Sequence, residues 1–122
     1  MQHIQWMIRS AALVAALTLG TAVAHAHAFL DHASPLVGST VKSSPNEVRM
    51  WFTQQLEPNF SGAQLRSSAG AVLGNGVVDT ADPKQMVIPT HGLPPGRYKV
   101  TWKVLSVDTH RTEGSFSFEV KP

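Results

Sequence analysis

Three residues of this chain, His27, Asp108 and His110, have the side chains and the positions needed to bind a metal ion. His27 follows Ala24-His25-Ala26, a small-x-small motif at which a secretory protease would cut. A histidine at a free N-terminus offers two nitrogens, the α-amine and the imidazole, which can close a chelate ring. Asp108 and His110 add a carboxylate and a second imidazole. Residues two apart in an extended chain project on the same side, with Cα atoms about 6.6 Å apart, so both can face one ion. Together these groups predict a nitrogen-rich Cu(II) site.

The first 26 residues have the pattern of a cleaved signal peptide. Met1–Arg9 carries one positive charge, and Ser10–Leu19 is apolar. The apolar stretch is shorter than the roughly 20 residues that span a bilayer, so it predicts export and cleavage. Cuts after Ala24, Ala26 or Ala28 are all compatible with the motif. We expect removal of residues 1–26, which leaves residues 27–122 as one domain.

Composition excludes several classes of protein. The chain has no cysteine, so neither disulfides nor thiolate ligands are available, which suits an exported protein of the bacterial periplasm. Its formal net charge is +2, and Arg9 of the predicted signal peptide contributes one of these charges. Such a charge gives no electrostatic case for binding nucleic acid.

The apolar residues after the predicted cut alternate with polar ones, which is typical of β-strands. The clearest strands are Glu47–Thr53, Gly96–Leu105 and Gly114–Val120. Tyr98, Val100, Trp102 and Val104 form one face of the second. Weaker strands are predicted at Ala28–His32, Ala63–Ser67, Ala71–Val78 and Gln85–Pro89, with turn residues between them. Short strands at this spacing predict an all-β fold, an antiparallel β-sandwich.

The predicted metal ligands follow the strand that ends near Leu105, at an edge of the sandwich where loops carry function. Strand alternation alone would direct Asp108 and His110 toward the face that carries Trp102. The chain must therefore bend after Val104 if both side chains are to reach solvent.

At these residues the chain resembles the CopC family of periplasmic copper-binding proteins, and the match covers nearly all of residues 27–122. The matching segments are His27-Ala28-Phe29-Leu30, Ala33-Ser34-Pro35, Met50-Trp51-Phe52-Thr53, Phe60-Ser61-Gly62-Ala63, Asp82-Pro83-Lys84, Met86-Val87-Ile88-Pro89, Pro95-Gly96-Arg97-Tyr98-Lys99-Val100-Thr101-Trp102 and Val107-Asp108-Thr109-His110. The resemblance implies a cupredoxin-like or immunoglobulin-like Greek-key sandwich or barrel. It also implies one Cu(II) per chain, bound by His27, Asp108 and His110. An inner-membrane copper transport protein, CopD, is the partner that it implies.

The chain departs from the family pattern at two places. Some members bind Cu(I) through a Met-rich segment, but Ser67–Asp82 contains neither Met nor His, so we expect no such site. Members often have a glutamate that can hydrogen-bond the metal-bound amine. This chain has Gln54 there, which can accept a hydrogen bond but carries no charge.

Other interpretations of the same residues stay open. His27 could be a remnant of the signal peptide, and Asp108 and His110 could form a solvated turn. A histidine-brace copper monooxygenase or oxidase is the main rival function, and a metal-independent periplasmic interaction module is the other. We predict a copper-binding protein that is not an enzyme, acting in copper tolerance or delivery, because Asp108 would fill the position where dioxygen binds.

The remaining histidines, methionines and an exposed tryptophan have simpler predicted roles. His32 is predicted to lie on the surface and His91 in a solvated turn. Met50 and Met86 lie in strand patterns and are expected to fill the core. Trp51 points away from Phe52 in a regular strand, so it could cover the edge of the site or pack under a loop.

Overall fold

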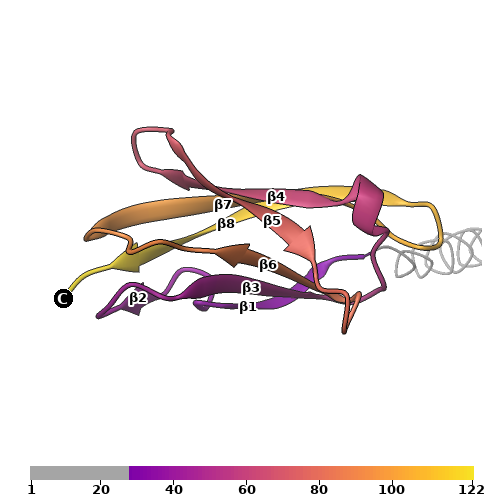
Figure 1. Ribbon diagram of the computed structural model, residues 1–122, viewed down its shortest axis with the longest axis horizontal. Coiled ribbons are helices and arrows are strands. Elements are labelled where there is room, and N and C mark those ends of the chain that lie inside the picture. The colour runs from indigo at the N-terminus through magenta and orange to yellow at the C-terminus, as the bar shows by residue number, and fades with distance from the viewer. Residues whose placement is uncertain (1–27) are drawn as a thin grey trace, which may run out of the picture.

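The computed structural model describes residues 28–122, which form eight strands and one short 3-10 helix (Figure 1). The elements are β1 (Leu30–Ser34), β2 (Thr40–Val41), β3 (Glu47–Phe52), η1 (Pro58–Phe60), β4 (Gly62–Ser67), β5 (Val72–Val78), β6 (Gln85–Pro89), β7 (Gly96–Leu105) and β8 (Arg111–Val120). The predicted signal peptide and His27 lie outside the described residues. Within residues 28–122, no helix has the length and apolar character needed to cross a membrane.

The strands follow one another in space in the order β1-β3-β6-β5-β4-β7-β8-β2. β5 joins the two layers of the sandwich, because its first part pairs with β4 and its last two residues, Val77 and Val78, pair with β6. The run β7-β4-β5-β6 has the 4-1-2-3 arrangement of a Greek key. Every pair is antiparallel except β2 with β8, which is parallel. The predicted all-β Greek-key sandwich is therefore confirmed.

The core lies between the two layers and is built from the alternating residues of the long strands. On β7, Tyr98, Val100, Trp102 and Val104 are buried while Arg97, Lys99 and Lys103 are exposed, as the alternation predicts. β3 and β8 bury their apolar faces in the same way. Met50 and Met86 are both 0% exposed, which confirms their predicted place in the core.

A glycine makes room for the largest core side chain. Gly114 on β8 pairs with Trp102 on β7, and a Cβ atom at Gly114 would lie 2.5 Å from the Trp102 ring. That ring also makes an edge contact with Phe52 on β3, with centroids 5.2 Å apart, across the two layers. The indole is thus fixed by close packing beneath the part of the sheet that leads to the β7–β8 loop.

The structure differs from the predicted strands mainly at their ends. β8 begins at Arg111 rather than Gly114, and its ladder with β7 runs to the Leu105–Arg111 pair. β1 covers Leu30–Ser34 rather than Ala28–His32, with an irregularity at Asp31. β2 was not predicted, because a strand of two residues has too few positions to show alternation.

Candidate metal centre

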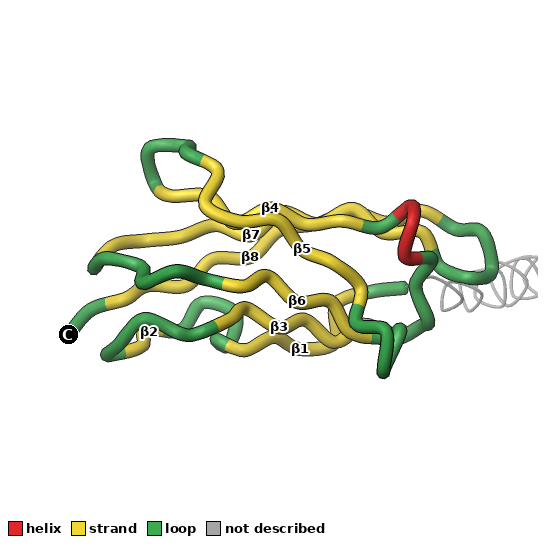
Figure 2. The backbone as a smooth tube through the Cα atoms, viewed as in Figure 1, coloured by secondary structure: helices red, strands yellow, loops and turns green. Residues whose placement is uncertain are grey.

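The segment from Ser106 to His110 forms the tight turn between β7 and β8, at the end of the sandwich that also holds η1 (Figure 2). The Ser106 N–H donates to the His110 carbonyl at 3.0 Å, and the Thr109 N–H donates to the Ser106 carbonyl at 2.9 Å. Thr109 has φ of 71°, in the left-handed region that non-glycine residues rarely occupy. Strand alternation continues to the buried Ser106 and stops there. The predicted bend is therefore present, and it carries Asp108 and His110 into solvent.

Asp108 and His110 converge at the tip of this turn. Asp108 Oδ2 and His110 Nδ1 lie 3.4 Å apart, and the two side chains are 40% and 50% exposed. Both can therefore be reached by an ion from solvent without a change in the fold. A carboxylate oxygen and an imidazole nitrogen at this spacing are the donors that a divalent copper ion accepts.

The buried Ser106 hydrogen-bonds the Asp108 carboxylate. It is 0% exposed, and its hydroxyl donates to Asp108 Oδ1 and lies 3.2 Å from the His110 carbonyl oxygen. The Ser106 hydroxyl, helped by hydrogen bonding and charge from His110, lowers the pKa of Asp108 below its ordinary value. The carboxylate is thus anionic at neutral pH and fixed in direction.

Replacing Ser106 by alanine is expected to raise the pKa of Asp108 toward its ordinary value, because the main hydrogen bond to the carboxylate is lost. The lowered pKa stabilises the fold at neutral pH, and that contribution disappears as pH falls through the folded-state pKa. The Ser106→Ala variant should lose less stability over that acid range. Titration of the Asp108 carboxyl carbon by NMR measures the shift, with Ser115→Ala on the exposed side of β8 as the control. An unchanged Asp108 pKa in Ser106→Ala would contradict this role for Ser106.

Residues 53–56, which follow β3, contact both the turn and the first described residues. On one side the Val107 N–H donates to the Gln55 carbonyl at 3.0 Å, and Leu56 bridges to Ser106. On the other side the Thr53 N–H donates to the Phe29 carbonyl, and the Phe29 N–H donates to Thr53 Oγ1, each at 2.9 Å. The half-buried Gln54 lies between these two sets of contacts.

The first described residue is anchored beside the turn. Ala28 is 0% exposed, and its carbonyl accepts a hydrogen bond from the Thr112 hydroxyl, two residues beyond His110. His27, the third predicted ligand, precedes Ala28 and lies outside the described residues. Within residues 28–122, no three His, Asp or Glu side chains gather in a way that could hold a metal ion. The described part of this site thus offers two ligand groups.

Among residues 28–122, a second histidine with a carboxylate partner, His32, lies away from the turn. His32 Nδ1 is 2.6 Å from Asp31 Oδ2, and the His32 ring stacks on Trp51 of β3 at 4.4 Å and 11°. This stack forms because His32 and Trp51 are register partners across β1 and β3. The predicted surface position of His32 is confirmed, and so is the exposure of His91 in its turn.

Two further residues shape the turn, Ser106 and Thr112, and neither was predicted from the sequence. Ser106 could have been noticed, since it continues the buried positions of Trp102 and Val104 with a hydroxyl in place of an apolar side chain. Thr112 could not, because its partner is the backbone of Ala28, 84 residues away in the sequence.

Comparison with known proteins gives consistent matches. Residues 30–121 match the model of the CopC domain. The chain is 38% identical over 122 residues to copper resistance protein C of Pseudomonas syringae pv. tomato, covering 89% of this chain and 92% of that protein. It is 32% identical over 117 residues to protein YobA of Escherichia coli K12, covering 93% and 94%.

Two solved structures share both the fold and part of the sequence. CopC from Methylosinus trichosporium OB3b superposes with a TM-score of 0.74 and 32% identity, covering 79% of this chain and 95% of that one. PcoC, described as a methionine-rich copper resistance protein from Escherichia coli, superposes with a TM-score of 0.69 and 34% identity, covering 79% and 100%.

Proposed function

Because the chain belongs to the CopC family, we propose that it binds one Cu(II) ion in the bacterial periplasm through His27, Asp108 and His110. Copper is the cargo of this protein, and the function is copper tolerance or delivery rather than catalysis. The observation that carries the proposal is the exposed Asp108–His110 pair. Asp108 Oδ2 and His110 Nδ1 lie 3.4 Å apart, and the buried Ser106 hydrogen-bonds the Asp108 carboxylate.

The anchoring of Ala28 supports His27 as the third ligand. Successive Cα atoms lie about 3.8 Å apart, so the Cα atom of residue 27 is that far from Ala28, whose carbonyl accepts the hydrogen bond from Thr112. Cleavage after Ala26 would give His27 a free amine as well as an imidazole. The resulting set of an amine, two imidazoles and a carboxylate contains only nitrogen and oxygen donors, which favour Cu(II) over the softer Cu(I).

Gln54 is proposed to support the metal-bound amine. It lies on the segment that contacts both Phe29 and Val107, so its backbone runs between the two halves of the proposed site. An amide oxygen can accept a hydrogen bond from the amine and hold it in place without adding charge.

The proposed biological role follows from the family and from the position of the site. A Cu(II) ion on an exposed turn can be sequestered or passed to another protein, and a CopD-like inner-membrane copper transport protein is the proposed recipient. Export through a signal peptide comprising residues 1–26 would bring the chain to the periplasm.

The proposal predicts one tightly bound Cu(II) and no Cu(I) site of comparable strength. The only methionines in residues 28–122 are Met50 and Met86, and both are fully buried, so their thioethers are not presented to an ion in solvent. Competition titrations of the exported protein, with one chelator for each oxidation state, measure both affinities. Tight Cu(I) binding would contradict the proposed ligand set, and sustained oxidation of a polysaccharide with added reductant would favour the monooxygenase instead.

A further inference from the structure

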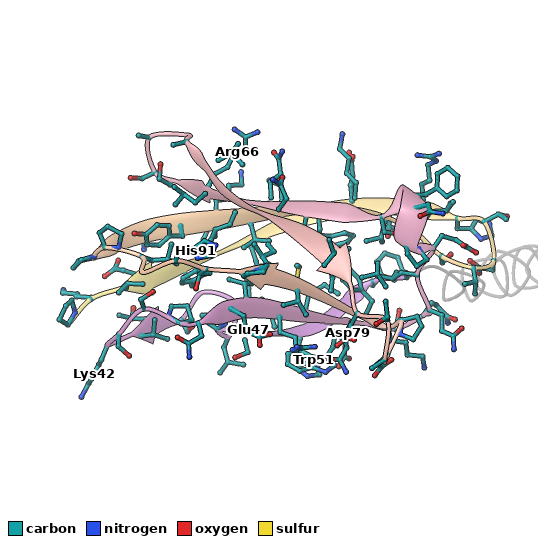
Figure 3. All side chains as sticks on the ribbon, viewed as in Figure 1. Lys42, Glu47, Trp51, Arg66, Asp79 and His91 are labelled. Carbon is teal, nitrogen blue, oxygen red and sulfur yellow. The ribbon has the colours of Figure 1, made fainter. Side chains whose placement is uncertain are left out.

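The outward sides of β4, β7 and β8 form a surface that we call the basic face. Five of its side chains are cationic: Arg66, Arg97, Lys99, Lys103 and Arg111. Two are carboxylates, Glu113 and Glu119. In the opposite layer and its adjoining 79–84 loop the carboxylates outnumber the cations, with Asp31, Glu47, Asp79 and Asp82 against Arg49 and Lys84. Figure 3 shows Arg66 on one side of the molecule and Glu47, Trp51 and Asp79 on the other.

The cations of the basic face are poorly compensated. Arg49 on the opposite layer pairs with Glu47 at 2.9 Å and Asp79 at 2.8 Å. On the basic face, Arg97 pairs with Glu119 at 3.2 Å and Lys103 with Glu113 at 3.9 Å, and the cation is at least 80% exposed in both pairs. Such exposed pairs contribute little to stability. Within residues 28–122, Lys99 has no ion pair, and neither does Arg111.

Two of these cations also oppose one another directly. Arg66 on β4 and Lys99 on β7 are register partners, and like charges in this arrangement repel across the sheet. Among the described residues, Arg66 hydrogen-bonds only to neutral groups, the Gln64 side-chain oxygen at 2.7 Å and the Gly70 carbonyl at 3.0 Å. A carboxylate from outside the chain would relieve this repulsion.

The shape of the surface favours a protein segment over a membrane. A groove crosses the basic face, and its lining includes the neutral hydrogen-bonding side chains of Gln64, Asn75, Thr101 and Ser115. Phe60 of η1 also lines this groove and is 61% exposed. Aromatic side chains of this kind are enriched in protein interfaces. A lipid surface, which is broad and flat, would not fill a groove of this kind.

The groove ends beside the candidate metal centre. Phe60 and Arg111 line the same hollow, and Arg111 is the residue that follows His110. We propose that the basic face docks an acidic segment of a partner protein, which would thereby lie next to the Asp108–His110 turn. The idea that copper is transferred at this position rests on the proposed function, whereas the docking of an acidic segment does not.

The test uses the exported protein, isotopically labelled and observed by NMR, with a synthetic peptide in which glutamate and serine alternate. Backbone signals of β4, β7 and β8 are expected to shift, whereas those of β1, β3 and β6 stay in place. The affinity should fall as salt is added, since the contacts are exposed. The same peptide with glutamine in place of glutamate should not bind.

Two double variants with equal changes in charge provide the comparison. Lys99→Glu with Lys103→Glu should weaken peptide binding by about tenfold or more, because both charges lie in the proposed interface. Lys42→Glu with Lys84→Glu, away from the basic face, should leave binding within about twofold of the unmodified protein once the general effect of net charge is screened by salt. Thermal melting and the NMR spectrum verify that each variant is folded.

The outcomes separate this inference from the proposed function. Absent or unlocalised shifts, equal binding of the glutamine peptide, or equal weakening by both double variants would overturn the docking surface. Binding of phosphatidylglycerol vesicles through β4, β7 and β8, without binding of the acidic peptide, would overturn it in favour of a membrane. Cu(II) titration of the same variants is independent: normal Cu(II) binding without peptide binding removes the docking surface alone, and the reverse result removes only the copper proposal.

Discussion

A chain that begins at His27 is expected to bind Cu(II) at least about a hundredfold more tightly than the same chain with one methionine placed before His27. The extra residue turns the α-amine of His27 into a peptide nitrogen and removes the chelate ring that this free amine closes with the His27 imidazole. Loss of a residue that merely supports a ligand costs about 10–100-fold in metal affinity, so loss of a direct ligand should reach the upper end of that range. Competition with a chelator gives the affinity, and the Cu(II) EPR spectrum gives the donor set.

The pH dependence of the same measurement has a defined sign. The α-amine, with an ordinary pKa of roughly 7.7–8.0, must lose its proton to the metal, and copper binds the neutral form of the imidazoles. Affinity should therefore fall as pH decreases below about 8. A chain beginning at His25 is the informative control, because His25-Ala26-His27 can capture Cu(II) without Asp108 or His110 and would give a different spectrum. Equal affinity and an unchanged spectrum for the methionine-extended chain would exclude the His27 amine as a ligand.

His110→Ala is expected to remove most of the stabilisation that Cu(II) gives to the folded chain, and Asp108→Ala a smaller part. A ligand that binds only the folded state stabilises it by about 4 kcal/mol at a thousandfold excess over Kd. For a domain of this size, each kcal/mol shifts Tm by about 4–8 °C, so the effect is easily measured by thermal melting. Without copper, His110→Ala should melt close to the unmodified protein, because an exposed side chain on a turn contributes little to stability, whereas Asp108→Ala should melt slightly lower because it loses the hydrogen bond from Ser106.

The chain provides its own control for this experiment. Asp31 and His32 form a second exposed carboxylate–imidazole pair, on β1, with a shorter separation of 2.6 Å. His32→Ala should retain the full shift of Tm with Cu(II), even though it breaks the stack on Trp51. A copper-induced shift that survives in His110→Ala, or disappears in His32→Ala, would require a different set of ligands.

The local sequence pattern predicted the positions of the long strands well. Alternation requires only that one side of a strand be apolar, so it identified the buried sides of Glu47–Phe52 and Gly96–Leu105 and the core positions of Met50 and Met86. It failed at β2, where the two residues Thr40 and Val41 are held by parallel pairing with Glu119 and Val120. Such pairing leaves no pattern in the sequence.

The sequence by itself identified Asp108 and His110, their spacing and their position after a strong strand. Its alternation also places Arg97, Lys99 and Lys103 on one side of β7. His27 stays a prediction of the sequence, because it lies outside the described residues.

Only the tertiary structure decided that the two candidate ligands face solvent. Their exposure depends on a turn that is closed by hydrogen bonds within residues 106–110 and is attached to Gln55 and Leu56, which are distant in the sequence. The pairing of Arg66 with Lys99, and the anchoring of Ala28 to Thr112, likewise join strands that the sequence does not relate. Side-chain alternation is a local property of an extended chain, whereas strand neighbours and turn conformation depend on how the whole core packs.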